Sequence, residues 1–243
     1  MASVRSQLVV LTHGAFHGGW CWSSLQAELD RRGIASLAPD LPGHGTSGEP
    51  LQDLDGDARS LRALLDRLDV DVVLVAHSYG GAVATQAAAG AANVSHILYV
   101  TAFVPDEGES VLSLVRSLPP AEYALPAAMV MGKTSCTIDP DHARATFYGE
   151  CTEWVAAAAT ARLDAQALAT FSQPVTAAAW RSIASTYVRC LRDQAIPIAH
   201  QTVMAARCKE VVTLDTDHSP FASKTAELAD IVEGVAVACR AVA

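Results

Sequence analysis

The chain has 243 residues, a length that single doubly wound or barrel-type α/β domains commonly reach. Its 17 Lys and Arg stand against 26 Asp and Glu, a net charge of −9, and no basic run offers contacts to phosphates, so we expect no nucleic-acid partner. With 51% hydrophobic and 18% charged residues, the chain can fill a large core, which excludes a disordered polymer.

The apolar segments are too short for a membrane span. Gln86, Asn93 and His96 interrupt the most hydrophobic region before it reaches the ~18 residues that a bilayer requires. The first seven residues carry one Arg and lead directly into a strand pattern, without the long apolar region of a secretory signal. We therefore expect a cytoplasmic protein that does not associate with membranes. The six cysteines form no C-x-x-C pair, which predicts free, mostly buried thiols and no metal site.

Short apolar runs alternate with helix-like sequence in two parts of the chain. The predicted strands are residues 8–12, 35–38, 70–76, 94–100, 186–191 and 210–214, and the later predicted helices are 197–207 and 223–240. This alternation predicts βαβ units and a mostly parallel sheet. Because the strands are continuously apolar, we expect a doubly wound sheet with helices covering both faces.

The alternation stops between residues 106 and 180. This segment is rich in Ala and prolines and shows no strong strand pattern, so we predict an inserted helical lid there. The α/β core would then comprise residues 1–105 and 181–243. Ligands bind at the carboxyl ends of the strands in open α/β sheets, and a lid over that edge would cover the binding site.

Residues 72–81 form the strongest motif: Val-Val-Leu-Val-Ala-His-Ser-Tyr-Gly-Gly, a buried strand pattern that breaks at a serine and continues into an Ala-rich helix. This is the pattern of a nucleophile elbow, whose sharp turn requires small residues two positions before and after the serine. Those positions are Ala76, where glycine is usual, and Gly80. The alternative is Ser78 as a helix N-cap in an ordinary βα turn, but the strand-turn-helix context favours a catalytic nucleophile.

A serine hydroxyl is a weak nucleophile and needs a base that a third group orients. Among the eight histidines, His218 follows the predicted strand 210–214, which puts it on a loop at the same sheet edge as Ser78. We therefore predict His218 as the base, against the alternative of a solvated loop histidine. His13 and His77 are expected to brace loops, and His44 lies in a turn.

The acid of the triad should lie between the serine and the histidine in the chain. Asp193 follows the predicted strand 186–191, one strand before the loop of the histidine. We favour it over Asp106, Asp215 and Asp217, because the acid must reach the far imidazole nitrogen from a neighbouring strand end. Asp193 could instead cap the helix that starts near Pro197.

Acyl transfer also needs two N–H donors for the developing oxyanion. The first is the amide of Tyr79, the residue after the nucleophile. The second is the amide of Ala15 in the segment 12–20, where Gly14 allows the backbone to turn. The glycines of this segment do not form a phosphate-binding loop, because G-x-x-x-G-G lacks the G-x-G-x-x-G spacing.

With these residues assembled, the chain resembles an α/β-hydrolase over all but the lid. Three segments resemble the branch of plant methylesterases and hydroxynitrile lyases and its bacterial relatives: residues 13–20 (HGAFHGGW), 38–45 (APDLPGHG) and 102–105 (AFVP). The resemblance implies a cofactor-free serine hydrolase acting on esters of small organic acids. It places Ser78, His218 and Asp193 on the family's triad positions and Ala15 and Tyr79 on its oxyanion positions.

Two positions separate this chain from the lyases of the branch. Those enzymes carry Thr in place of the glycine of His-Gly and Lys directly after the catalytic His. Here the two residues are Gly14 and Ser219, and Thr12 precedes His13 instead of following it. Both differences favour an esterase.

The candidate substrate-binding residues are chosen by their position near the motifs or in the lid. We expect Gly14, Phe16, His17, Trp22, Phe103 and Trp154 to contact a small ester substrate, with Phe147, Tyr148 and Trp180 as further candidates for the pocket wall. Large apolar side chains more often fill cores than line pockets, so a core role is the alternative for each aromatic residue.

Other functions stay open on the same fold. A lactonase, a thioesterase or a carbon–carbon bond-cleaving enzyme would use the same triad. A non-catalytic ligand receptor is the alternative from another class, although the chain retains every triad residue. Nothing in the sequence marks a dimer face, so a homodimer is neither predicted nor excluded.

Overall fold

The computed structural model describes residues 7–242 and contains a central six-stranded sheet, all of it parallel. The strand order is β2-β1-β3-β4-β8-β9. The strands are β1 (Gln7–Thr12), β2 (Ser36–Leu37), β3 (Asp71–His77), β4 (Val94–Val100), β8 (Ser185–Cys190) and β9 (Glu210–Leu214). Every predicted strand is confirmed to within two residues at each end, because continuous apolar runs bounded by turns have few other ways to be buried.

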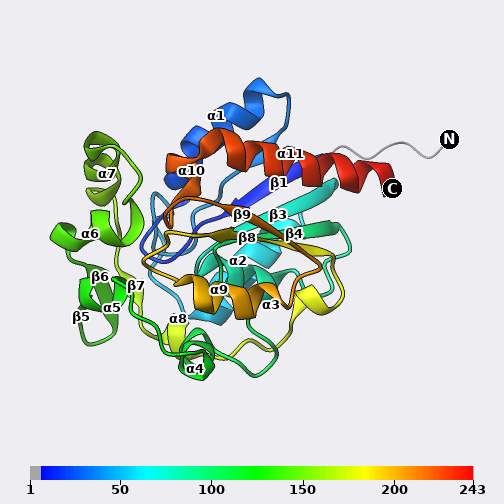
Figure 1. The fold of residues 1–243 in the computed structure, drawn as a ribbon. Helices are drawn as coiled ribbons and strands as arrows, with labels where there is room; N and C mark the ends of the chain where they lie inside the picture. The colour runs from blue at the N-terminus through cyan, green and yellow to red at the C-terminus, as the bar shows by residue number, and fades with distance from the viewer. Residues whose placement is uncertain (1–6, 243) are drawn as a thin grey trace.

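Helices cover both faces of this sheet (Figure 1). On one face lie α1 (Ser23–Arg31), α10 (Pro220–Ser223) and α11 (Thr225–Val242), preceded by the 3-10 helix η1 (Gly19–Trp22). On the other lie α2 (Leu54–Leu65), α3 (Gly80–Ala87) and α9 (Ile198–Ala205). Side chains of alternate strand positions fill two separate apolar clusters, as in Val9 and Leu11 on one face and Val10 on the other. The doubly wound α/β class is therefore confirmed.

Local sequence explains where the helices of the second face begin. Asp53 precedes α2 in an extended conformation, and its carboxylate accepts the amide of Gly56, a helix N-cap. Leu54, Leu61 and Leu65 of α2 are buried against the sheet, so the helix has one apolar side. Pro197, expected within the first helical turn, is the N-cap residue of α9.

The segment 106–180 differs from the all-helical expectation. It contains α4 (Val111–Ser117), α5 (Leu125–Ala128), α6 (Pro140–Phe147), α7 (Glu153–Thr160) and α8 (Ala169–Ser172), with the 3-10 helix η2 (Ala179–Arg181) across the end of the segment, but also a three-stranded antiparallel sheet. Its strands are β5 (Met129–Met131), β6 (Ser135–Ile138) and β7 (Gln166–Ala167). Strands of two to four residues are too short to show an alternating pattern, which is why the sequence does not reveal them.

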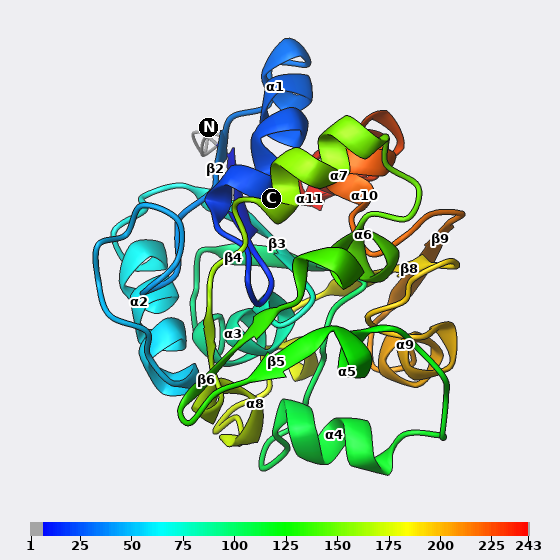
Figure 2. The ribbon, with the colours of Figure 1, turned by 90° about the vertical axis from the view of Figure 1, so that its left-hand side faces the viewer.

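The added sheet lies beside the carboxyl ends of the central strands. Figure 2, which faces this end of the molecule, shows β5 and β6 between α6 and α4. A tight turn joins the two strands, with the Gly132 amide donating to the Ser135 carbonyl at 2.8 Å. We call the segment 106–180 the lid from here on.

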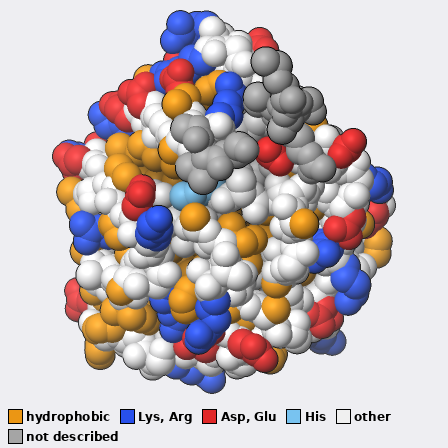
Figure 3. Space-filling view, turned by 90° about the vertical axis from the view of Figure 1, so that its right-hand side faces the viewer, with side chains coloured by type: hydrophobic (Ala, Val, Ile, Leu, Met, Phe, Trp, Pro, Cys, Tyr) orange, Lys and Arg blue, Asp and Glu red, His pale blue; other side chains and the backbone are white. Residues whose placement is uncertain are grey.

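The surface, the helix lengths and the cysteines agree with the expectations from the composition. On the face opposite the lid, basic and acidic side chains are interspersed (Figure 3). No helix within residues 7–242 has both the length and the apolarity needed to cross a bilayer. All six cysteines are free, and four of them are buried, as predicted.

Candidate active site

The chain turns sharply after β3, and this turn holds the backbone of Ser78 in the left-handed conformation. Ser78 has φ 52°, in the left-handed region that non-glycine residues seldom occupy. Its carbonyl accepts the amides of Gly81 and Phe103, both at 3.0 Å, and its own amide donates to the Val100 carbonyl at 3.4 Å. These bonds to β4 and to the loop behind it stabilise the turn. The side chain is half-buried at the start of α3.

Gly80 allows α3 to approach β1 closely enough to form this turn. A Cβ atom at position 80 would lie 2.4 Å from the His13 carbonyl oxygen, and one at Gly81 would lie 2.3 Å from the Phe103 carbonyl oxygen. Both neighbours are backbone atoms, which cannot rotate away as a side chain could. The small residues of the elbow motif are therefore required by helix-to-strand packing.

Gly80→Ala is expected to destabilise the fold by about 3 kcal/mol or more, since overpacking against backbone forces the helix to shift. The control is Gly234→Ala in the exposed interior of α11, where a Cβ meets nothing within 4 Å. That substitution should stabilise by about 0.5–1 kcal/mol through helix propensity. Urea unfolding of both variants measures the difference. Equal effects at the two positions would contradict the packing argument.

His218 lies on the loop between β9 and α10 and is buried. Its Nδ1 lies 2.7 Å from Oδ2 of Asp193. The hydrogen bond to a carboxylate assigns the proton to Nδ1, so Nε2 carries a lone pair that can accept a proton. The backbone of this loop is fixed as well, because Nε2 of His77 donates to the His218 carbonyl at 2.8 Å. Burial lowers the pKa of His77 well below the ordinary histidine value, so this side chain is a neutral donor.

Asp193 is held by donors on both of its oxygens. Oδ1 accepts the amides of Ala195 and Ile196 at 2.7 and 2.8 Å, and Oδ2 accepts the hydroxyl of Thr101 in addition to His218. The carboxylate therefore both caps the turn before α9 and orients the imidazole. Asp193 is not the N-cap of α9, since that residue is Pro197 and no side chain caps the helix.

The competing carboxylates have other partners. Asp106 and Asp215 form exposed ion pairs with Arg181 and Arg192. Asp217, next to His218, is buried but accepts the amides of Glu150 and Ser219 at 2.8 and 3.0 Å.

The loop after β1 passes directly beside Ser78. A Cβ at Gly14 would lie 2.8 Å from Cβ of Ser78, so only glycine permits this approach. The Gly14 carbonyl accepts Nδ1–H of His13, and the Ala15 carbonyl accepts Nδ1–H of His17, at 2.8 and 2.9 Å. Burial lowers the pKa of His13 to about 3 and that of His17 to about 4. Both rings are therefore neutral near pH 7 and brace the loop by hydrogen bonding.

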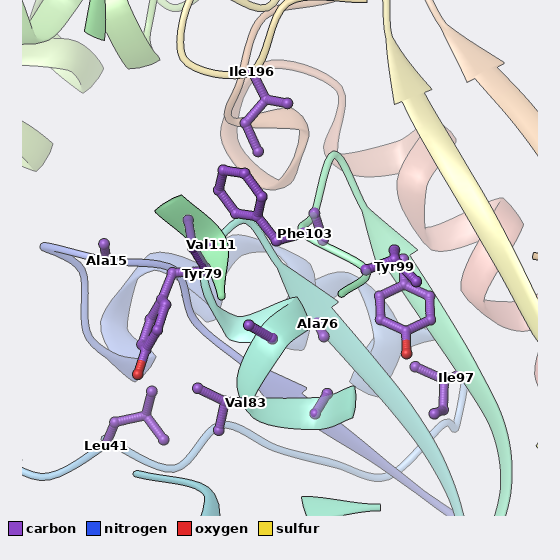
Figure 4. Packing of buried hydrophobic residues seen from close by; sticks show 14 of the residues in the cluster. Ala15, Leu41, Ala76, Tyr79, Val83, Ile97, Tyr99, Phe103, Val111 and Ile196 are labelled. Carbon is purple, nitrogen blue, oxygen red and sulfur yellow. The ribbon is translucent and has the colours of Figure 1, made fainter. Parts of the chain in front are cut away.

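A cavity of about 420 Å³ opens beside Ser78, with Ala15 and Tyr79 in its wall. Most of the remaining lining comes from the lid and is apolar, including Val111, Leu125, Met129, Phe147, Leu168 and Phe171. Phe103 and Ile196 close another side, and Figure 4 shows the Phe103 ring pointing toward Ile196. Phe147, in the cavity wall, also packs against His218, with the two ring centroids 5.6 Å apart. Such a pocket suits an apolar small molecule.

Some of the predicted substrate contacts line the cavity, others lie behind its wall, and others lie away from it. Phe16 and Phe103 line the cavity, as does the further candidate Phe147. Gly14 and His17 belong to the loop behind the cavity wall; His17 is bonded to the hydroxyl of Tyr148 at 2.8 Å.

Trp22 and Trp154 are wrong as substrate contacts. Trp22 is fully buried on the other face of the sheet, with its ring 5.0 Å from Phe221. Trp154 is 79% exposed on α7. Trp180 is likewise not in the cavity wall, and its indole N–H donates to the Pro105 carbonyl at 2.9 Å. Proximity in sequence to a motif or to the lid does not determine which way an aromatic ring points.

A buried carboxyl group lies below the elbow. Oδ2 of Asp57, from α2, accepts the Tyr79 hydroxyl at 2.7 Å, and Oδ1 has no hydrogen-bond partner within the described residues. Burial raises the pKa of Asp57 to about 7, even though the bond from Tyr79 acts in the opposite direction. No sequence pattern marks this group, because Asp57 lies in the first turn of a helix, where acidic residues are common.

Asp57→Asn is expected to make stability less dependent on pH. The native carboxyl holds a proton up to about pH 7, whereas the unfolded chain releases it near pH 4, so wild-type stability falls as pH rises between these values. From pH 5 to pH 8 the free energy of unfolding of wild type should therefore fall by about 2–3 kcal/mol more than that of the variant. Urea unfolding at both pH values measures this. Asp66→Asn, at the exposed end of the same helix, is the matched control that removes a carboxylate without touching the buried one. Parallel profiles for wild type and Asp57→Asn would contradict the argument.

Within residues 7–242, no group of three or more His, Cys, Asp or Glu side chains is arranged to hold a metal ion.

Comparison with known proteins places the chain in a family. Residues 9–231 match the family model described as the alpha/beta hydrolase family. Over 196 residues the chain is 33% identical to a carbendazim-hydrolysing esterase from Nocardioides, covering 76% of this chain and 79% of that protein. It is 28% identical to methylesterase 7 of Arabidopsis thaliana over 93% of this chain and 95% of the relative.

Solved structures show the same fold. A pyrethroid hydrolase from Sphingobium faniae superposes with a TM-score of 0.84 at 24% identity, over 96% of this chain and 98% of that one. An Arabidopsis methylesterase superposes with a TM-score of 0.79 at 24% identity, over 94% and 98% of the two chains. Together with the matched family model, these likenesses show that the chain belongs to the α/β-hydrolase family, in the branch that contains the methylesterases.

Proposed function

We propose that this protein hydrolyses carboxylic esters of small organic molecules through an acyl-enzyme on Ser78. The observation that carries the proposal is the 2.7 Å hydrogen bond between His218 and Asp193, both buried, behind a serine held at an elbow turn. The apolar cavity beside Ser78 and the names of the relatives, an esterase and methylesterases, support an ester as the substrate.

The first half of the reaction acylates the serine. Nε2 of His218 accepts the proton of Ser78 Oγ as this oxygen attacks the carbonyl carbon. Asp193 stabilises the imidazolium that forms. The amides of Ala15 and Tyr79 hold the oxyanion, and collapse of the tetrahedral intermediate expels the alcohol, which takes its proton from His218.

The second half regenerates the enzyme. Water loses a proton to Nε2 of His218 as it attacks the acyl carbon, and the new oxyanion uses the same two amides. Collapse breaks the acyl–Oγ bond, Ser78 recovers its proton from the imidazolium, and the carboxylic acid leaves. Every proton transfer uses His218, so acylation and hydrolysis depend on the same base.

Assays across bond types test the reaction class with wild-type protein. We expect saturable hydrolysis of p-nitrophenyl and methyl esters, with a higher kcat/KM than for matched lactones, thioesters and cyanohydrins. An esterase that accumulates acyl-enzyme should also release p-nitrophenol in an initial burst equal to the enzyme concentration. A preference for a thioester, lactone or carbon–carbon bond would change the assigned activity, and tight binding without any turnover would indicate a receptor.

A further inference from the structure

Side chains bind both the carbonyl and the N–H of the peptide unit between Ala15 and Phe16. The N–H is bound by a lid residue directly, and the carbonyl is bound through His17 to a second lid residue. The carbonyl oxygen of this peptide unit, on Ala15, accepts Nδ1–H of His17 at 2.9 Å. Its N–H, on Phe16, donates to Oε1 of Gln166 at 3.3 Å. Phe16 itself has φ 67°, a left-handed conformation that surrounding contacts must maintain in a non-glycine residue.

Gln166 is fully buried in β7, and the Phe16 amide together with the Thr170 hydroxyl sets the orientation of its side-chain amide. Oε1 accepts the Phe16 amide and lies 3.0 Å from Nε2 of His44, whereas Nε2 donates to the Thr170 hydroxyl at 3.1 Å. That hydroxyl donates in turn to the Ala167 carbonyl at 2.6 Å, so it must accept from Gln166. A flipped amide would put two donors, the Phe16 N–H and the Gln166 NH₂, against each other.

The other end of the peptide depends on Tyr148. Because the Nδ1 proton of His17 is given to the Ala15 carbonyl, Nε2 must accept, and the Tyr148 hydroxyl donates to it at 2.8 Å. Tyr148 is fully buried at the end of α6. A third contact comes from the lid backbone, where the Asp164 amide donates to the Phe16 carbonyl at 2.7 Å.

We propose that Gln166 and Tyr148 are positioning residues through which the lid sets the orientation of the oxyanion hole. This inference rests on the proposed function, because it assigns the Ala15 amide to the oxyanion. The Ala15 amide belongs to the preceding peptide unit, so fixing the next one on both sides restricts the two backbone torsions of Ala15. A lid that moves away from the core would release these restraints, and the hole would lose its alignment.

Four variants separate alignment from general stability. Gln166→Met removes the acceptor for the Phe16 amide at similar side-chain length, Gln166→Glu keeps an acceptor, and Tyr148→Phe removes the donor to His17. The matched control is Gln173→Met, since Gln173 is a second lid glutamine whose amide binds the core, at the Asp55 amide and carboxylate (3.2 and 2.7 Å), away from this loop. Thermal unfolding of each variant records the stability change that accompanies it.

For Gln166→Met we expect kcat to fall about ten- to a hundredfold with KM within about twofold, less than the ~10²–10³ that loss of a whole oxyanion donor costs. Affinity for a trifluoromethyl ketone, whose adduct places an oxyanion in the hole, should fall by the same factor. Tyr148→Phe should lower both quantities in the same direction. Gln166→Glu should recover most of the kcat, and Gln173→Met should leave kcat and ketone affinity unchanged.

Two results would overturn the inference: Gln166→Met with wild-type kcat and ketone affinity, or equal losses in Gln166→Met and Gln173→Met, which would show a general effect of lid stability. Either result leaves the proposed function intact as long as wild type hydrolyses the ester. If wild type itself shows neither turnover nor ketone binding, the proposed function fails first.

Discussion

Ser78→Ala is expected to lower kcat for ester hydrolysis by about 10⁶-fold, the loss that removing a triad nucleophile typically causes. In the proposed mechanism the Oγ atom carries the acyl chain, so neither burst nor steady turnover should remain above the rate that binding and the oxyanion amides alone support. Apolar ligand binding should persist, because the cavity is lined mainly by other side chains. Stopped-flow release of p-nitrophenol measures both phases.

Ser172→Ala is the matched control for that experiment, since Ser172 is a second serine in the wall of the same cavity. It should keep the burst and kcat close to wild type. Turnover that survives in Ser78→Ala but is lost in Ser172→Ala would place the nucleophile elsewhere. Burst and turnover both unaffected by Ser78→Ala would show that Ser78 is not the nucleophile.

Asp193→Asn is expected to lower kcat by about 10⁴-fold while the fold is retained. Oδ1 of Asp193 accepts two backbone amides, so the oxygen of Asn must occupy that position and its NH₂ must face His218. The imidazole would then turn Nδ1 into an acceptor and carry its proton on Nε2, where it cannot take a proton from Ser78. Steady-state kinetics at pH 7 with circular dichroism of the variant measure the loss and the fold.

The control is Asp217→Asn, the buried carboxylate that adjoins His218 in sequence and bonds to the amides of Glu150 and Ser219. That change should lower stability but reduce kcat far less, because Asp217 does not determine the imidazole tautomer. A larger loss of kcat in Asp217→Asn than in Asp193→Asn would show that the acid has been misassigned.

The sequence predicted those parts of the site that local chain geometry determines. A strand that breaks at a serine flanked by small residues can only turn sharply, and loops that follow parallel strands meet at one edge of the sheet. Ser78, His218 and Asp193 each follow such a strand, so their arrangement was predictable without knowledge of the packing. The parallel sheet was predictable for a similar reason, since its strands are apolar on both faces.

The rest depends on contacts between distant segments. Trp22 and Trp154 lie near the oxyanion segment or in the lid, yet one packs behind the sheet and the other faces solvent. The lid strands β5 to β7 are stabilised by pairing with one another, which leaves no pattern in so few residues. Gln166 reaches Phe16 across 150 positions of the chain, and no local motif marks a glutamine for that contact.

Labelling with a fluorophosphonate followed by peptide mass spectrometry tests most directly whether Ser78 is the covalent nucleophile. We predict one phosphonyl adduct, located on Ser78, that forms together with loss of esterase activity and that His218→Ala forms far more slowly. Esterase activity that persists with Ser78 unmodified, or inactivation with the adduct on another residue, would contradict the mechanism.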